Sequence, residues 1–218
     1  MAGFVLDDAK LEAVLAAQEA QVARRRAHQY LEQLGRGYQW LDRPAEARAA
    51  FLEAAELFER KMEETGRHDP GRQLEAGVCL LHAGEPEAAR AWFSRALEGG
   101  ARDVNVAALH YLLGDDDAAL AAARVLDDPG EKRDAVAALA AARRDRDAEG
   151  ARGARDVLLG GLRSDRLAPG ETSGPSWGSW DVVGESFRLE AELAGRPMPS
   201  YREMLVRLGL RPAEANAS

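Results

Sequence analysis

The sequence predicts an all-α protein built as a helix-hairpin solenoid, and three observations support that prediction. Alanine, leucine, arginine and glutamate are abundant, whereas isoleucine is absent and threonine is scarce. The abundant residues lose little side-chain freedom in a helix, and the scarce ones favour strands. Apolar residues recur at spacings of three and four, which is the period of an amphipathic helix. A pattern of small and aromatic residues also repeats along the chain, as expected when helix pairs stack on one another.

The first segment, residues 1–27, is expected to be helical. Four apolar residues share one helical face in it: Leu11, Val14, Leu15 and Val22. The carboxylates of Asp7 and Asp8 favour a helix start, because they can cap free backbone N–H groups and complement the helix dipole. No glycine or proline follows until Gly35. We therefore expect either one long helix from about Asp8 to Gly35 or two helices that nearly abut.

Two helix hairpins with the same residue pattern come next. The first turns at Asp42–Pro44 and the second at Ala83–Pro86. Matching positions lie 42 residues apart: Gly35 and Gly77, Tyr38 and Leu80, Ala47 and Ala89, Phe51 and Phe93, Ala54 and Ala96. Small residues let two helices approach closely, and a large ring fills the space between neighbouring pairs. A shorter hairpin around Gly114–Asp116 and a degenerate one over residues 135–162 keep weaker forms of the pattern.

This pattern resembles the tetratricopeptide repeat. That repeat has a small residue on its first helix, a bulky residue three positions later, and an Ala, aromatic, Ala series on its second helix. The resemblance covers residues 28–163. It departs from the family at Glu59, which stands where a proline is usual, and in the spacing of 42 residues instead of about 34. We therefore expect the second helix of the first repeat to be lengthened towards Gly66.

The composition changes after the repeats. Residues 164–179 are rich in glycine, serine and proline and predict a loop, which carries Trp177. Residues 180–218 return to a helical period and predict two helices that cap the solenoid. The second of these is expected to begin with a capping box formed by Ser200 and Glu203. We expect all these segments to form a single domain.

The charge balance bears on the class of partner. The net charge is −8 and the pI is about 5.2, so attraction to nucleic-acid phosphates is weak and a basic protein partner is favoured. The start of the sequence lacks a signal-peptide pattern, and no window is apolar enough for a membrane span. The single cysteine, Cys79, allows no internal disulfide. A cytoplasmic protein without nucleic-acid or membrane contacts is expected.

Three short motifs could carry chemistry, and each has a simpler interpretation. Gly174–Gly178 matches a nucleophile-elbow pattern, but no strand precedes it. Cys79 and His82 are three residues apart on a predicted helix, yet two ligands do not make a zinc site, and Cys79 lies among apolar residues. Asp115–Asp117 is interpreted as a helix start. We therefore expect no enzymatic activity, no metal and no cofactor.

The tetratricopeptide resemblance implies a concave groove lined by the first helices of successive repeats. It assigns to that groove Glu32, Arg36, Gln39 and Trp40, then Leu74, Val78, Leu81 and His82, then Val104, Ala108, Tyr111 and Leu112. The basic clamp that some family members use for an acidic peptide terminus is not evident, and the groove is predicted to be largely apolar. Its occupant would be a partner segment or residues 167–180 of this chain, with Trp177 as a contact residue.

Three functions remain open at this point. An adaptor that binds a polypeptide segment is the leading hypothesis. A bacterial immunity-type protein that neutralises a cognate toxin is the second, because the Ala-, Arg- and Gly-rich composition is typical of a GC-rich bacterial source. The third is an enzyme or small-molecule binder with a pocket between the repeats and the cap. The sequence identifies neither the partner nor the oligomeric state.

Overall fold

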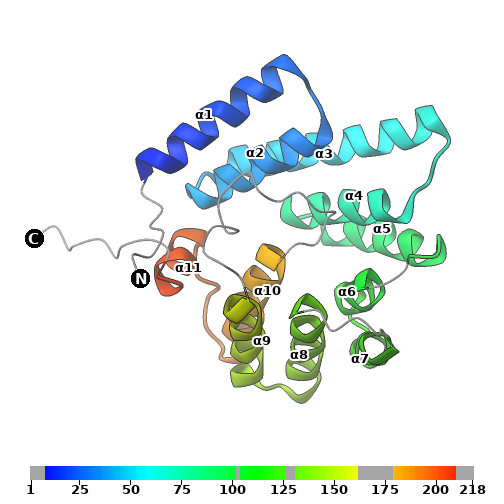
Figure 1. Ribbon diagram of the computed structural model, residues 1–218, viewed down its shortest axis with the longest axis vertical. Coiled ribbons are helices and arrows are strands. Elements are labelled where there is room, and N and C mark those ends of the chain that lie inside the picture. The colour runs from blue at the N-terminus through cyan, green and yellow to red at the C-terminus, as the bar shows by residue number, and fades with distance from the viewer. Residues whose placement is uncertain (1–7, 102–103, 126–130, 162–178, 210–218) are drawn as a thin grey trace, which may run out of the picture.

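The structure is a computed structural model that describes residues 8–101, 104–125, 131–161 and 179–209. Within these ranges the chain forms eleven helices and no strand, which confirms the all-α prediction (Figure 1). The helices are α1 (Asp8–Arg24), α2 (His28–Trp40), α3 (Pro44–Thr65), α4 (Pro70–His82), α5 (Pro86–Glu98), α6 (Val104–Leu113), α7 (Asp116–Val125), α8 (Glu131–Asp145), α9 (Ala148–Gly161), α10 (Ser179–Leu193) and α11 (Tyr201–Arg207).

Local signals in the sequence explain where several of these helices begin and end. Helices α3, α4 and α5 each start at a proline, whose fixed φ and missing N–H suit the first helical position. The predicted capping box of α11 is present, because the Ser200 side chain accepts from the backbone N–H of Glu203 and the Glu203 carboxylate accepts from that of Ser200. Helix α3 ends at Gly66, which adopts the left-handed conformation at φ 61°.

The N-terminal region consists of two helices that nearly abut. Helix α1 ends at Arg24 and α2 begins at His28, so a three-residue break separates them. Helix α1 packs against α2 and buries Leu11 and Leu15. The long helix predicted to run towards Gly66 is also present, since α3 extends to Thr65. The predicted loop at 164–179 falls almost entirely on residues 162–178, which lie outside the described part of the chain.

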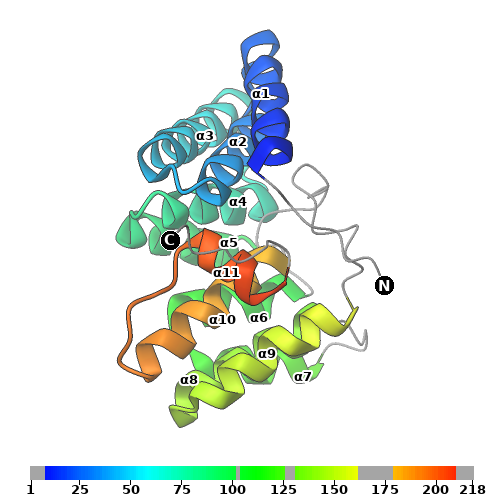
Figure 2. The same ribbon diagram turned by 90° about the vertical axis from the view of Figure 1, so that its left-hand side faces the viewer.

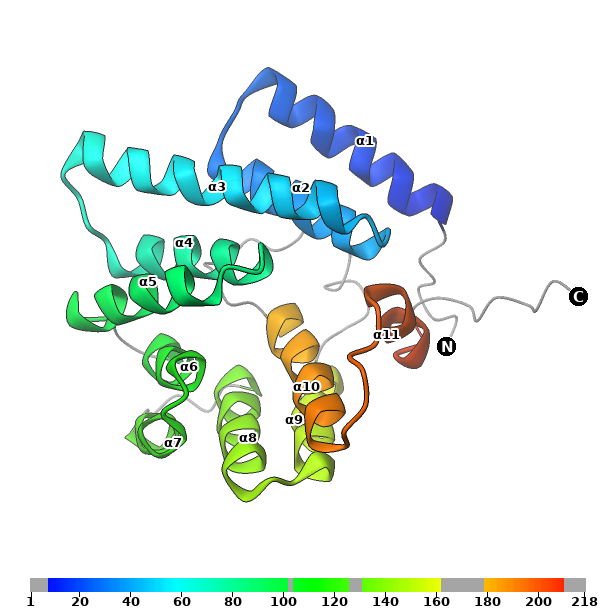
Figure 3. The ribbon, with the colours of Figure 1, turned by 180° about the vertical axis from the view of Figure 1, so that it is seen from behind.

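Helices that follow one another among the described residues pack against each other, and successive pairs follow one another around the molecule (Figures 1 and 3). In the first two hairpins the predicted contact of a small residue with a ring is present. A Cβ atom added at Gly35 would lie 2.9 Å from the ring of Phe51, and one added at Gly77 would lie 2.4 Å from that of Phe93. Both rings are buried. The two hairpins therefore share the same close contact between a glycine on the first helix and a phenylalanine ring on the second.

The last two helices close this arrangement. Helix α10 lies on the inner side of the curved array and packs against α8 and α9, while α11 contacts both α10 and α2 (Figure 2). On α10, Val182, Val183, Phe187 and Leu189 are buried. The inner face of the helix array is therefore filled by the chain itself. Within the described residues, no helix is both long enough and apolar enough to cross a membrane.

The contact between Gly77 and Phe93 makes a prediction about stability. We expect Gly77→Ala to lower the free energy of unfolding by about 1–3 kcal/mol, because the new methyl group would overlap a ring that is packed on all sides. Urea denaturation followed by far-UV circular dichroism measures the change. The matched control is Gly153→Ala in α9, where a Cβ atom meets nothing within 4 Å. That variant should gain up to about 1 kcal/mol from helix propensity. A Gly77→Ala protein as stable as the wild type would contradict the packing.

Candidate functional site

The candidate site is centred on Asp181, in the first turn of α10. Its carboxylate accepts two hydrogen bonds from the guanidinium of Arg36 on α2, with Nη1 to Oδ1 at 2.6 Å and Nη2 to Oδ2 at 3.1 Å. The ring of His82, at the end of α4, lies with Nε2 2.7 Å from the same Oδ1. The side chain of Asp181 is only 2% exposed. Three helices that are distant in sequence therefore meet at one buried carboxylate.

Neighbouring side chains hold Arg36 and His82 in place. Arg36 also pairs with Glu32 one turn earlier on α2, with Nη2 3.0 Å from Oε1. Nδ1 of His82 lies 3.2 Å from Nε2 of Gln39, and the His82 ring stacks on Phe51 with centroids 4.9 Å apart. A neutral ring with its proton on Nε2 donates to Asp181 and accepts from Gln39, so this tautomer satisfies both nitrogens.

The electrostatics of the cluster favour a charged carboxylate. Burial by itself would raise the pKa of Asp181, but the positive charge of Arg36 and the hydrogen bond from His82 outweigh it and hold that pKa well below its usual range. The pKa of Arg36 is raised, because the charges of Asp181 and Glu32 outweigh the effect of its burial. The site therefore suits a carboxylate presented at the start of a helix.

Polar contacts also hold the rest of α10. The hydroxyl group of Tyr111 on α6 donates to Glu185 across 2.6 Å. Farther along the helix, Glu190 pairs with Arg155 on α9 at 3.2 Å, and the Arg155 guanidinium lies 3.9 Å from the centroid of the Phe187 ring. Asp181, Glu185 and Glu190 on α10 thus each contact a hydrogen-bond donor from a neighbouring helix. The polar side chains of α10 are therefore complementary to the helices around it.

Several of the residues assigned to the groove lie beside α10, and most of the assigned residues are buried or half-buried. Arg36, Gln39 and His82 converge on Asp181 as described above. Four of the others are at least 95% buried: Trp40, Leu74, Val78 and Tyr111. Leu81 and Leu112 are half-buried. Trp177 and the Gly174–Gly178 motif lie outside the described residues, as do residues 167–178 of the suggested covering segment 167–180, whose last two residues begin α10. A partner-binding role for these positions stays a prediction.

Two features of the site were absent from the sequence analysis. Asp181 was not singled out, because its partners lie 145 and 99 positions away in the chain. Arg36 and His82 were assigned to the groove separately, and only the structure brings them together on one carboxylate. One sequence signal could have indicated it, since Asp181 is the single charged residue between Trp180 and two valines in a segment that predicts a buried helix.

The other candidate motifs have structural roles where the chain is described. Cys79 is fully buried, and burial raises the pKa of its thiol, so it packs as a small hydrophobe. The carboxylate of Asp115 accepts from the backbone N–H of Ala118 at the start of α7. Asp116 pairs with Arg143 of α8 at 2.6 Å. Among the described residues, no group of three or more His, Cys, Asp or Glu side chains is arranged to hold a metal ion.

Comparison with models of protein families finds no family that matches this chain. Comparison with curated proteins likewise finds no significant match.

Glu75 on α4 makes the folding stability of the protein depend on pH. Its pKa is raised to about 7, because burial disfavours the charged form and Glu32 repels it. The folded protein therefore holds this proton more tightly than the unfolded chain, in which the pKa is about 4.3. Stability is consequently lost as the pH rises through that interval, and the loss is complete above about pH 7.

We expect Glu75→Gln to be more stable than the wild type by about 1–2 kcal/mol near pH 8, and to show no gain near pH 4. Urea denaturation at several pH values measures this difference. Glu56→Gln, at an exposed position in the middle of α3, is the control and should be neutral throughout. Equal effects of Glu75→Gln at both pH values would refute the argument.

Proposed function

We propose that this protein is a tetratricopeptide-like interaction scaffold that binds a helical segment of another polypeptide on its inner face. In this proposal α10 is the resident occupant of that face, and a partner segment exchanges with its first turns. The proposal makes the protein an adaptor, with no chemical reaction of its own.

One observation carries the proposal. Arg36, Gln39 and His82 come from the first helices of two successive hairpins, the positions that the repeat alignment assigns to a binding groove. All three take part in the cluster around a carboxylate on a helix from elsewhere in the chain. This face is thus built to hold a helix, in the manner of helix-in-groove recognition.

The contacts of α10 define the chemistry of a suitable segment. It would be a helix with a carboxylate in its first turn, as at Asp181, because buried Arg36 needs a negative partner. Apolar residues would follow directly, as Val182 and Val183 do, and an aromatic residue one to two turns later would take the place of Phe187. This combination of charge and apolar spacing is a specific requirement.

Occupation by α10 should keep binding in trans weak. A tethered helix has an effective concentration that a free segment must exceed. Displacing α10 also interrupts its contacts with α8 and α9, so a partner that replaces only the first turns would be favoured. The scaffold would then respond to partners that match the site closely.

The proposal is tested with a labelled peptide of residues 179–193, the sequence of α10. Fluorescence anisotropy measures its affinity for the full chain and for the full-length Asp181→Asn variant. We expect affinity for the variant to be at least tenfold higher, because the variant leaves the buried Arg36 with Glu32 as its remaining carboxylate partner, and the peptide can restore the lost ion pair. Circular dichroism establishes that the variant is folded.

A peptide with asparagine at the position of Asp181 is the matched control and should lose this gain. Full-length Val183→Ala provides an independent variant, since it loosens α10 by removing buried methyl groups and keeps the carboxylate in place. It should also bind the peptide more tightly than the wild type. Equal affinity for all three chains, or equal affinity of the two peptides, would rule out exchange at this face.

A further inference from the structure

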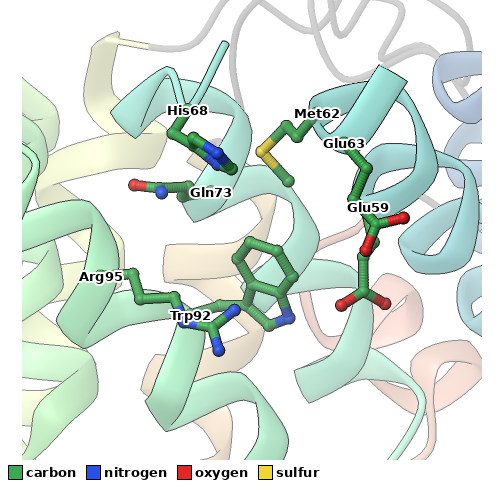
Figure 4. Close-up of a pocket in the computed structure, with 7 residues that line it drawn as sticks. All are labelled: Glu59, Met62, Glu63, His68, Gln73, Trp92 and Arg95. Atoms are coloured by element: carbon green, nitrogen blue, oxygen red, sulfur yellow. The ribbon is translucent and has the colours of Figure 1, made fainter. Parts of the chain in front are cut away.

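A second site lies away from the inner face, where the extension of α3 meets α4 and α5. A cavity of about 310 Å³ is present there. Figure 4 shows its side chains, which come from the last turns of α3, the α3–α4 connection at His68, the start of α4 and the second half of α5. Helix α3 is 22 residues long, whereas the matching helix α5 has 13. The cavity is therefore built by the segment in which the first hairpin departs from the family pattern.

The lining of this cavity combines an apolar floor with unpaired acceptors. Met62 is buried, and the half-buried indole of Trp92 forms a wall. Glu59 and Glu63 stand one helical turn apart on α3 and are exposed. Neither carboxylate has a cation or hydrogen-bond donor among the described residues. The side chain of Gln73 is 6% exposed and forms part of the wall, but its Oε1 is buried and points away from Met62 and Trp92 in Figure 4, so the two glutamates are the acceptors that a ligand would meet.

Arg95 is the arginine in the lining, and it already makes a contact of the kind that a bound cation would make with the indole of Trp92. The guanidinium carbon of Arg95 lies 4.8 Å from the centroid of the Trp92 ring, which is a cation–π contact. With the imidazole of His68 counted as neutral, the lining has two carboxylates and one guanidinium, which leaves one negative charge in excess. The protein as a whole also carries a net charge of −8. An anionic ligand would be repelled, and a cation would be attracted.

We propose that this cavity takes the side chain of an arginine or lysine from a basic polypeptide partner. The aliphatic stem of such a residue packs on Met62 and Trp92, while its charged end lies between Glu59 and Glu63. Arginine fits best, because a planar guanidinium presents several donors to carboxylates and also stacks on aromatic rings. None of the residues that line this cavity belongs to the cluster around Asp181, so the proposal does not depend on the function proposed above.

The test uses the full-length ¹⁵N-labelled protein and N-acetyl-arginine amide as the probe. The indole N–H resonance of Trp92, assigned with Trp92→Phe, should move in a saturable manner with a Kd on the order of 1 mM. N-acetyl-lysine amide should bind more weakly. N-acetyl-citrulline amide has nearly the same shape but no charge, and it should produce no saturable shift.

Full-length Glu59→Gln/Glu63→Gln should weaken arginine-amide binding at least tenfold. Glu56→Gln changes an exposed carboxylate of the same helix outside the cavity, and it should leave binding unchanged. Equal shifts with the arginine and citrulline probes would overturn the proposal, as would full affinity in the Gln variant. A saturable shift of Trp92 with inorganic phosphate in place of the arginine amide would instead show an anion site centred on Arg95, and would also overturn it.

Discussion

The buried ion pair between Arg36 and Asp181 is the interaction on which the closed arrangement of this chain depends. It joins the first hairpin to the last helix pair across 145 positions of sequence. Removing both charges from water is costly, and their attraction offsets that cost only when geometry is good and the remaining donors and acceptors are satisfied. Here the second nitrogen of Arg36 meets Glu32, and His82 shares the Asp181 carboxylate. The pair therefore specifies which helix, and which turn of it, occupies the inner face.

A second constraint acts at shorter range and sets the shape of the hairpins. The rings of Phe51 and Phe93 approach the facing helix so closely at Gly35 and Gly77 that a Cβ atom at either glycine would overlap the ring. Such contacts fix the separation and register of the two helices of each hairpin, because protein interiors tolerate neither overlap nor voids. The long α3 then extends beyond its partner, and the last turns of α3 have to find other neighbours. Trp92 on α5 supplies one of them, across the cavity described above.

These constraints explain how much could be predicted from the sequence. Contacts that recur along the chain, such as Phe51 with Gly35, leave a periodic signal, and the helix class and the long α3 followed from it. Helix ends marked by proline, by the left-handed Gly66 or by the box at Ser200 could also be anticipated. The inner-face cluster could not, because Asp181 is paired by tertiary geometry alone and nothing near it in sequence records its partners. A pattern of residue spacing describes local packing and carries no information on which distant element completes it.

The two candidate binding sites also differ in the burial of their carboxylates, and this difference determines what each could bind: Asp181 is buried, whereas Glu59 and Glu63 are exposed. On the inner face a carboxylate is buried, so the proposed exchange has to supply another carboxylate or leave the buried Arg36 with Glu32 alone, which is destabilising. At the cavity beside Trp92, Glu59 and Glu63 are exposed, and unpaired carboxylates in water carry no such cost. Binding there can only add interactions, each of them weak and sensitive to salt. The two proposals therefore differ in kind: exchange at the inner face would replace one buried carboxylate by another, and binding at the cavity beside Trp92 would be a readily reversible contact with a basic partner.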